Sequence, residues 1–266
     1  MMSAIGGKQA LFISDLHLDP ETPELLAEFL LFLETRAAGA QALYILGDLF
    51  EKWIGDDDEH SLGNQVAEAL RKLADTGTEI YLMHGNRDFL IGEQYARKCH
   101  ATLLQEPHIM ERHGQRAVLI HGDSLCTRDL AYMQFRQMVR SSRWQQDFLG
   151  KSLVERQMIA QQARQQSQEA NSNKASDIMD VTPQEVIKLL QEQQVNTLIH
   201  GHTHRPAVHT LRLEKPINGS LEAQRLVLGS WDQKGWVLAL DESGFNLQHF
   251  RFQASPNSPN FSPKAK

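Results

Sequence analysis

The sequence has little of what a disulfide-stabilised or membrane-spanning protein needs. Its 266 residues include only two cysteines, Cys99 and Cys126, which form no C-x-x-C pair. This scarcity excludes a disulfide framework and a zinc–thiolate site as the basis of the fold. No run of about 18 apolar residues occurs, and the first eight residues lack the apolar stretch of a secretory signal. We expect a cytosolic protein without a transmembrane helix, whose membrane contact is peripheral.

Positive charge is also scarce, because the formal net charge is −6. This balance argues against generic nucleic-acid binding through a basic surface. Hydrophobic residues make up 41% of the chain, which is sufficient for a packed core. The length fits one domain with an insertion. We expect a single domain over residues 1–252, including a helical insertion at about 128–178, followed by a disordered tail at 253–266 that is rich in proline, serine and asparagine.

What the sequence does contain is a ladder of five short motifs rich in metal ligands. In chain order they are Asp15-Leu16-His17, Gly47-Asp48, Gly85-Asn86-Arg87-Asp88, His121-Gly122-Asp123 and Gly201-His202-Thr203-His204. Their oxygen and imidazole donors are Asp15, His17, Asp48, Asn86, His121, His202 and His204. Seven donors are enough for two divalent cations that share one carboxylate. Two metals about 3.5–4 Å apart are a common device for attacking phosphorus with a metal-bound hydroxide.

The motifs follow short apolar segments that are typical of buried strands. The expected strands before the first three motifs are Ala10–Ser14, Ala42–Leu46 and Glu79–Met83, with helices near Pro23–Ala37 and Gly63–Thr76 between them. This alternation indicates parallel strands, whose carboxyl ends gather at one edge of a sheet. Polar ligands at strand ends are therefore expected to meet.

The second half of the chain repeats the arrangement. Arg116–Ile120 leads into His121, and Thr197–His200 leads into the last motif. Thr182-Pro183-Gln184-Glu185 predicts a helix start with a capping box. Four further segments predict strands of an antiparallel second sheet: Ala207–Leu213, Arg225–Leu228, Trp236–Leu240 and Phe245–Phe252.

The donors divide into two groups by their positions. Asp15 and His17, two residues apart, can hold one cation, and His204 would complete that site. Asp48 can place one oxygen on each metal, while Asn86, His121 and His202 would complete the second site. Nitrogen and oxygen donors without a thiolate suit manganese, iron, cobalt or zinc, and the oxygen share favours manganese. We therefore expect two Mn²⁺ ions; for any single histidine the alternative is a structural role, which we assign to the other eight.

Arg87 carries the most specific information about the leaving group. Many two-metal phosphoesterases have at this position a histidine that protonates an alkoxide, whereas arginine does not give up a proton near neutral pH. A phosphate that leaves from a phosphoanhydride is a weak base and needs no acid. A guanidinium that neutralises its developing charge would suffice. The alternative is a surface arginine paired with Asp88.

The ordered motifs resemble those of the calcineurin-like metallophosphoesterase superfamily, and the resemblance spans most of residues 10–250. It implies an α/β (α+β) fold, with a two-sheet β-sandwich core flanked by helices and carrying a helical lid insertion. Longer matches occur over Tyr44–Phe50, Trp53–Asp58, His84–Leu90, Ile178–Val181 and Leu198–Pro206. They are similar to the branch that hydrolyses UDP-2,3-diacylglucosamine to UMP and 2,3-diacylglucosamine 1-phosphate in lipid A biosynthesis.

This resemblance also implies site residues and a location. Asp15, His17, Asp48 and His204 would bind one manganese, and Asp48, Asn86, His121 and His202 the other. The residues implied to contact substrate are Asn86, Arg87, Asp129, Ser167, Asn171, Lys174 and His202. The resemblance places the protein peripherally on the cytoplasmic face of the bacterial inner membrane. No sequence feature indicates an oligomeric state.

Residues 128–174 differ in charge from the rest of the chain. They contain eight basic and four acidic residues, which gives this segment +4 and leaves −10 elsewhere. Apolar residues such as Phe135, Trp144 and Met158 interleave with the charges at roughly helical spacing. One interpretation is an amphipathic lid that rests on anionic lipid, where each positive charge adds about 1 kcal/mol. The other is an ordinary helical insertion that buries its apolar face on the sandwich.

Two other functions are compatible with parts of this pattern. The chain could be a phosphoesterase for another nucleotide or a phosphoprotein, although Arg87 and the amphipathic insertion argue against it. It could instead be a scaffold that has lost its metals, although the complete ligand set argues against that.

Overall fold

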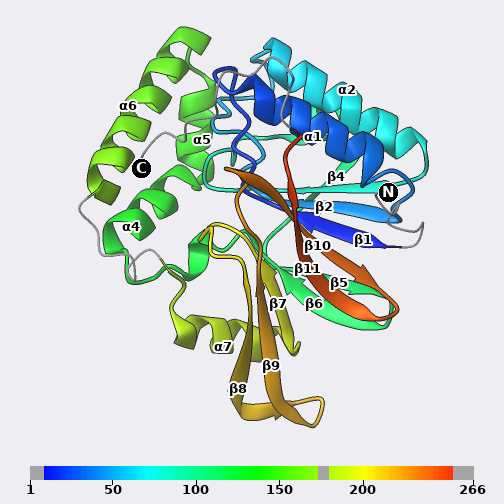
Figure 1. Cartoon of the computed structure of the whole chain (residues 1–266). Coiled ribbons are helices and arrows are strands. Elements are labelled where there is room, and N and C mark those ends of the chain that lie inside the picture. The colour runs from blue at the N-terminus through cyan, green and yellow to red at the C-terminus, as the bar shows by residue number, and fades with distance from the viewer. Residues whose placement is uncertain (1–8, 173–179, 254–266) are drawn as a thin grey trace.

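Two β-sheets packed face to face form the centre of the molecule, and helices cover their outer faces (Figure 1). The computed structural model describes residues 9–172 and 180–253, and of residues 166–172 it describes only the backbone. The first sheet has the order β11-β10-β1-β2-β3-β4, with β1 Ala10–Ile13, β2 Ala42–Leu46, β3 Glu79–Met83, β4 Ala101–Leu104, β10 Lys234–Asp241 and β11 Gly244–Arg251. The second has the order β5-β6-β7-β9-β8, with β5 His108–Arg112, β6 Gln115–Leu119, β7 Thr197–His200, β8 Ala207–Ile217 and β9 Ser220–Val227.

The predicted two-sheet α/β fold is thereby confirmed, but the predicted pairing of the last strands is wrong. They do not form a separate antiparallel sheet, because β10 pairs antiparallel with β1 and brings β11 into the first sheet. The second sheet is mixed, since β6, β7 and β9 run parallel while β5 and β8 pair antiparallel at its edges. A strand's alternation fixes which side chains face inward but does not select its partner strand.

Both faces of β1 are buried, which explains its continuous apolar sequence. Leu11 and Ile13 pack in a cluster with α1 (Pro23–Thr35) and α2 (Ser61–Asp75). Ala10 and Phe12 belong to a second cluster, which joins the two sheets through side chains such as Tyr44 and Ile199. A third cluster packs α7 (Pro183–Gln193) on the second sheet. The parallel strands are thus buried on both sides, as such sheets require.

The start of α7 lies where the sequence predicts, but the predicted capping box does not form. Thr182 is the N-cap residue, yet its side chain makes no capping hydrogen bond. Its hydroxyl instead accepts a hydrogen bond from the Thr127 hydroxyl at 2.8 Å, which ties the helix start to the loop before the insertion. Tertiary contact therefore replaces the local cap.

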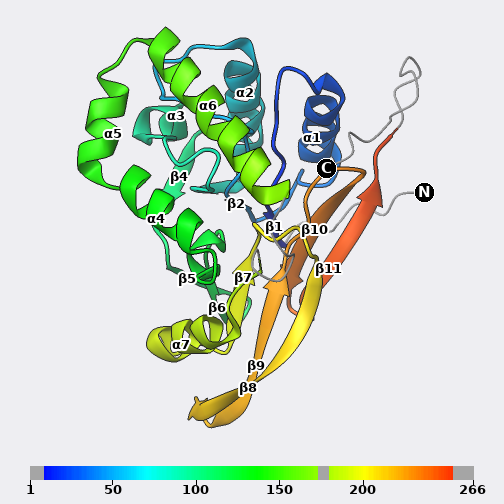
Figure 2. The same ribbon diagram turned by 90° about the vertical axis from the view of Figure 1, so that its left-hand side faces the viewer.

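Three helices, α4 (Leu130–Val139), α5 (Ser142–Leu149) and α6 (Leu153–Ser172), form the lid, which stands beside the carboxyl ends of the parallel strands (Figure 2). The short helices η1 (Asp123–Leu125) and α3 (Glu93–Lys98) complete the described elements. Phe148 of α5 is buried in the cluster beneath α1 and α2, and Trp144 and Ile159 pack against it. Within 9–172 and 180–253, no helix has the length and apolar character to cross a bilayer.

Candidate metal centre

All seven predicted donors lie at the carboxyl ends of five strands. Asp15 and His17 follow β1, Asp48 follows β2, and Asn86 follows β3. The second sheet supplies His121 after β6, and His202 and His204 after β7. Two groups of donors have ligand atoms that all lie within 4.8 Å of one another: Asp15, His17 and His204, and Asp15, Asp48 and His121. The parallel strands therefore bring together residues that are far apart in the sequence.

Asp48 occupies the middle of the cluster. Its Oδ2 lies 3.7 Å from His17 Nε2 and 3.7 Å from His121 Nε2, so this oxygen is equally distant from the two histidines. Its Oδ1 accepts a hydrogen bond from the Arg87 amide at 2.8 Å. This position is the one expected of a carboxylate shared by two cations.

Asn86 links the remaining histidines. Its Oδ1 lies 3.0 Å from His121 Nε2 and 2.8 Å from His202 Nδ1. The other ring nitrogen of His121, Nδ1, lies 2.9 Å from the Leu46 carbonyl, to which it donates. That bond leaves Nε2 as the nitrogen with a lone pair directed into the cluster.

The backbone at most of the donors has a left-handed conformation that non-glycine residues rarely adopt. Asp15, His17, Asp48, His202 and His204 all have positive φ, between 51° and 65°. Non-glycine residues rarely adopt this conformation, and sparsely populated backbone states that cost about 1–3 kcal/mol each cluster at functional sites. Five of the seven donors therefore depend on the surrounding structure to hold them.

Two features hold the strained loops in place. A Cβ atom on Gly85 would lie 2.0 Å from Asp48 Oδ1 and 2.2 Å from the Asp48 nitrogen, so the loops after β2 and β3 meet only because residue 85 is glycine. The fully buried Asp88 carboxylate accepts hydrogen bonds from the amides of Asp48, Leu49, Phe50 and Gly85. Asp88 therefore binds the backbone of both loops, and the alternative of a surface pair between Arg87 and Asp88 is wrong.

Charges within the cluster shift the pKa values of its members strongly. Burial alone would raise the pKa of Asp15, but His204, His121 and His17 hold it far below its usual range. Burial disfavours the charged His121 ring, yet the nearby Asp48 and Asp15 carboxylates raise its pKa to about 9. Burial, with His121 beside it, lowers the pKa of His202 to about 3. A site that concentrates buried carboxylates in this way attracts cations.

Arg87 projects beside the donors, half-buried, with its Nη1 3.9 Å from Glu51 Oε1. Sequence reasoning missed Glu51, which lies 2.8 Å from His17 Nδ1 through its Oε2. The signal was a carboxylate three residues after Asp48, directly following the apolar Leu49 and Phe50. Burial would raise the pKa of Glu51, but His17, Arg87 and Arg164 lower it to about 2.

Of the predicted substrate residues, Asn86, Arg87 and His202 lie in or beside the donor cluster. The other four are not placed there by the described part of the structure. Asp129 is the N-cap residue of α4, and its carboxylate accepts a hydrogen bond from the Tyr132 amide at 3.1 Å. Ser167 and Asn171 lie on α6, in the part whose side chains are not described, and Lys174 lies outside the described residues. Substrate contact stays a prediction for all seven residues.

Four arginines of the lid pair with groups of the sandwich and its loops. Arg136 pairs with Asp123 at 2.8 Å, Arg140 donates to the Gly85 carbonyl at 2.9 Å, and Arg164 lies 3.3 Å from Glu51. The buried Arg156 pairs with Asp57 and donates to the Ile54 carbonyl at 2.8 Å. These arginines attach the lid to the sandwich, so the charge excess of the insertion is smaller at its surface than its sequence indicates.

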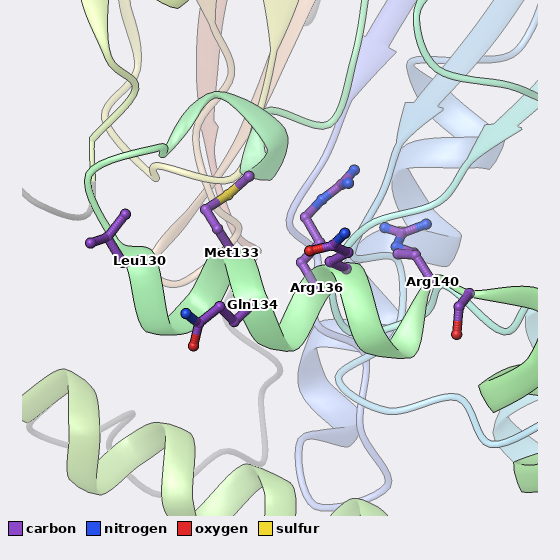
Figure 3. A pocket seen from close by; sticks show the side chains of 7 residues that line it. Leu130, Met133, Gln134, Arg136 and Arg140 are labelled. Atoms are coloured by element: carbon purple, nitrogen blue, oxygen red, sulfur yellow. The ribbon is translucent and has the colours of Figure 1, made fainter.

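The lid also exposes several large apolar side chains. Among the described residues, six of the eight most exposed large apolar side chains lie on it: Leu130, Phe135, Met138, Leu149, Val154 and Met158. A groove of about 570 Å³ follows α4, with Leu130 and Met133 at one end and Arg136 and Arg140 at the other (Figure 3). Because Arg140 also binds the Gly85 carbonyl, this groove adjoins the loop that carries Asn86 and Arg87.

Comparison with known proteins identifies relatives over nearly the whole chain. A family model described as calcineurin-like phosphoesterase matches residues 9–206. The UDP-2,3-diacylglucosamine hydrolase of Ectopseudomonas mendocina is 50% identical over 240 residues, covering 90% of this chain and 97% of that protein. The proteins of the same name from Marinobacter nauticus and Pseudomonas fluorescens are 51% and 48% identical, covering 86% and 91% of this chain and 91% and 95% of their own lengths.

Proposed function

Since this chain belongs to the calcineurin-like phosphoesterase family, we propose that it hydrolyses the pyrophosphate bond of UDP-2,3-diacylglucosamine, giving UMP and 2,3-diacylglucosamine 1-phosphate. The observation that carries the proposal is the joint presence, at one edge of the sandwich, of seven donors and an arginine in place of an acid. The names of the full-length relatives support the same substrate.

The donor set fits a pair of divalent cations. Asp15, His17, Asp48 and His204 would hold one, and Asp48, Asn86, His121 and His202 the other. The equal distances from Asp48 Oδ2 to His17 and His121 support its role as the shared ligand. Oxygen and imidazole donors without thiolate favour Mn²⁺ among the candidate ions. We expect EDTA to abolish hydrolysis, and Mn²⁺ to restore it more fully than Zn²⁺, Co²⁺ or Mg²⁺.

When bound, two divalent cations supply a water nucleophile of lowered pKa and neutralise phosphoryl oxygens. Water adds to the uridylyl phosphorus and the bridging P–O bond breaks, so the leaving group is a phosphate monoester. Asn86 and His202 orient the phosphoryl group. Arg87 neutralises the charge that develops on the phosphates, and its fixed charge explains why no proton donor is needed.

The lid supplies a surface for the lipid part of the substrate. Its groove combines apolar side chains with two arginines, which suits a molecule with acyl chains next to phosphate. The exposed Val154 and Met158 would contact the membrane, and we place the protein peripherally at the cytoplasmic face of the bacterial inner membrane. Because four lid arginines are paired with the sandwich, we expect this contact to be more apolar than the sequence alone indicates.

Product identification tests the proposed reaction. Hydrolysis of UDP-2,3-diacylglucosamine in H₂¹⁸O should release UMP that carries the label, because the water adds to the uridylyl phosphorus. Label in the lipid phosphate would contradict the site of attack. A panel with p-nitrophenyl phosphate, a phosphopeptide and 2′,3′-cyclic AMP should give much lower kcat/KM. Faster turnover of any of these would overturn the substrate assignment.

Variants test the role of Arg87. We expect Arg87→Ala to lower kcat/KM by about 10²–10³-fold, as loss of one transition-state charge donor does elsewhere. Its metal content should match wild type, since the guanidinium is not a ligand. Arg71→Ala, which removes an exposed arginine from α2, is the control. An Arg87→His variant that hydrolyses pyrophosphates as well as wild type does would contradict the argument.

A further inference from the structure

Glu51 lies between three charged groups that come from three parts of the fold. Its Oε2 is 2.8 Å from His17 Nδ1, in the loop after β1. Its Oε1 faces two arginines, Arg164 of the lid at 3.3 Å and Arg87 of the loop after β3 at 3.9 Å. The side chain is only 14% exposed, so these contacts take up most of its surroundings. One carboxylate thus divides its two oxygens between the donor cluster and the lid.

The contact with His17 determines which ring nitrogen faces the cluster. His17 Nε2 lies 3.3 Å from His204 Nε2 and 3.7 Å from Asp48 Oδ2. With Glu51 Oε2 only 2.8 Å from Nδ1, a proton is favoured on Nδ1, which leaves the lone pair on Nε2. His121 is oriented by the same principle, but its Nδ1 faces the Leu46 carbonyl. Carboxylates behind ligating histidines fix the ring and raise its basicity, and their loss commonly costs about 10–100-fold in metal affinity.

The contact with Arg164 is the second charged attachment of α6. Near its start, the helix is held by Arg156, which is buried against Asp57 and the Ile54 carbonyl. Arg164 lies eight residues further on, about 12 Å along the helix at 1.5 Å per residue. There it meets Glu51 and, at 3.8 Å, Asp19. Arg156 has its own partners outside the cluster, so among the charged side chains described on α6 it is Arg164 that contacts groups beside the donors.

We propose that Glu51 is a positioning residue that couples the lid to the metal centre: Oε2 orients His17, and Oε1 holds Arg164 of α6. His17 would hold a bound cation, and that bond would fix its ring. The fixed ring would hold Glu51 in place, and Glu51 would hold α6. Such coupling is reciprocal, so the attached lid also favours the cation-binding arrangement of His17. This inference rests on the metal centre of the proposed function.

Metal titration of the substrate-free protein tests the first half. Glu51→Gln keeps the shape of the side chain but removes its charge, and we expect it to weaken Mn²⁺ binding by about 10–100-fold in calorimetric titration. Glu59→Gln removes an exposed glutamate that pairs with Lys98, and its affinity should equal that of wild type. Wild-type affinity in Glu51→Gln would overturn the role in orienting His17.

Amide hydrogen exchange of residues 153–165 tests the second half. In wild type, Mn²⁺ should slow exchange in this part of α6, and in Glu51→Gln and Arg164→Met that metal-dependent protection should be lost. Protection by Mn²⁺ that persists in Arg164→Met would overturn the coupling. Circular dichroism establishes that each variant is folded, and Glu51→Asp, which retains the charge on a shorter chain, should recover part of the metal affinity.

Neither measurement uses substrate, so its outcome is separate from the identity of the reaction. A protein that binds Mn²⁺ tightly, with Glu51-dependent affinity, but does not hydrolyse UDP-2,3-diacylglucosamine would refute the proposed substrate and leave the coupling standing. A wild-type protein that binds no divalent cation would refute both.

Discussion

Replacing Asp88 by asparagine should destabilise the protein far more than a one-atom change normally does. Asp88 Oδ1 accepts from the Gly85 amide at 2.8 Å and the Asp48 amide at 3.2 Å, and Oδ2 accepts from the Leu49 amide at 2.8 Å and the Phe50 amide at 3.4 Å. Whichever way the asparagine amide turns, its NH₂ faces two buried amides that then lack an acceptor.

The size of the effect follows from those contacts. A buried donor without a partner costs about 1–3 kcal/mol, so two of them cost roughly 2–6 kcal/mol. A loss of about 3 kcal/mol corresponds to a fall in Tm of roughly 6–12 °C for a domain of this size. Asp88 is fully buried, so water does not replace the lost acceptor.

Thermal unfolding followed by circular dichroism in EDTA measures this effect without a contribution from bound metal. The control is Asp75→Asn, an aspartate 59% exposed that pairs with His100 at the surface. Its stability should lie within about 0.5 kcal/mol of wild type. A Tm for Asp88→Asn within 2 °C of the Asp75→Asn value would refute the claim that this carboxylate holds the two loops together.

Four further predictions concern the metal centre and the lid. Because the pKa of His121 is about 9 in the metal-free cluster, metal binding at pH 7.5 should release a proton. This release should disappear above about pH 10. Equal calorimetric heats of metal binding at pH 7.5 in two buffers of different ionisation enthalpy would contradict it. The same raised pKa stabilises the metal-free fold below the ordinary value of 6.5, and this contribution is lost as pH rises through 9. The Tm in EDTA should therefore fall between pH 6.5 and 9, and a constant Tm over that window would contradict the raised pKa. Gly85→Ala should abolish tight Mn²⁺ binding, because the added Cβ would overlap Asp48. In the control, Gly114→Ala, the added Cβ meets nothing within 4 Å. This control should lower the free energy of unfolding in urea by only about 1 kcal/mol and leave metal affinity unchanged. Arg156→Met should speed tryptic cleavage near Lys151 several-fold. The effect should exceed that of Asp57→Asn, because the Asp57 side chain is 60% exposed and that of Arg156 only 3%. Equal cleavage rates of Arg156→Met and wild type would show that this pair does not anchor α6.

Local sequence patterns were sufficient for the elements that carry the donors. The apolar runs at Ala42–Leu46 and Glu79–Met83 became strands with the predicted bounds, because a strand buried on both faces has few polar positions and ends where they resume. Parallel pairing of such strands places their ends at one edge, which is why the donors after them could be predicted to meet.

Contacts between distant segments decided the rest. β10 and β11 joined the first sheet, since strand pairing depends on partners that the local alternation does not specify. Arg164 pairs with a carboxylate 113 positions earlier, so the charge that the lid presents could not be read from its composition. By itself the sequence determined that the seven candidate donors and Arg87 lie at strand ends, because each follows a recognisable strand. Only the tertiary structure placed Glu51 between His17 and the lid, since nothing in its own neighbourhood of the chain indicates either partner.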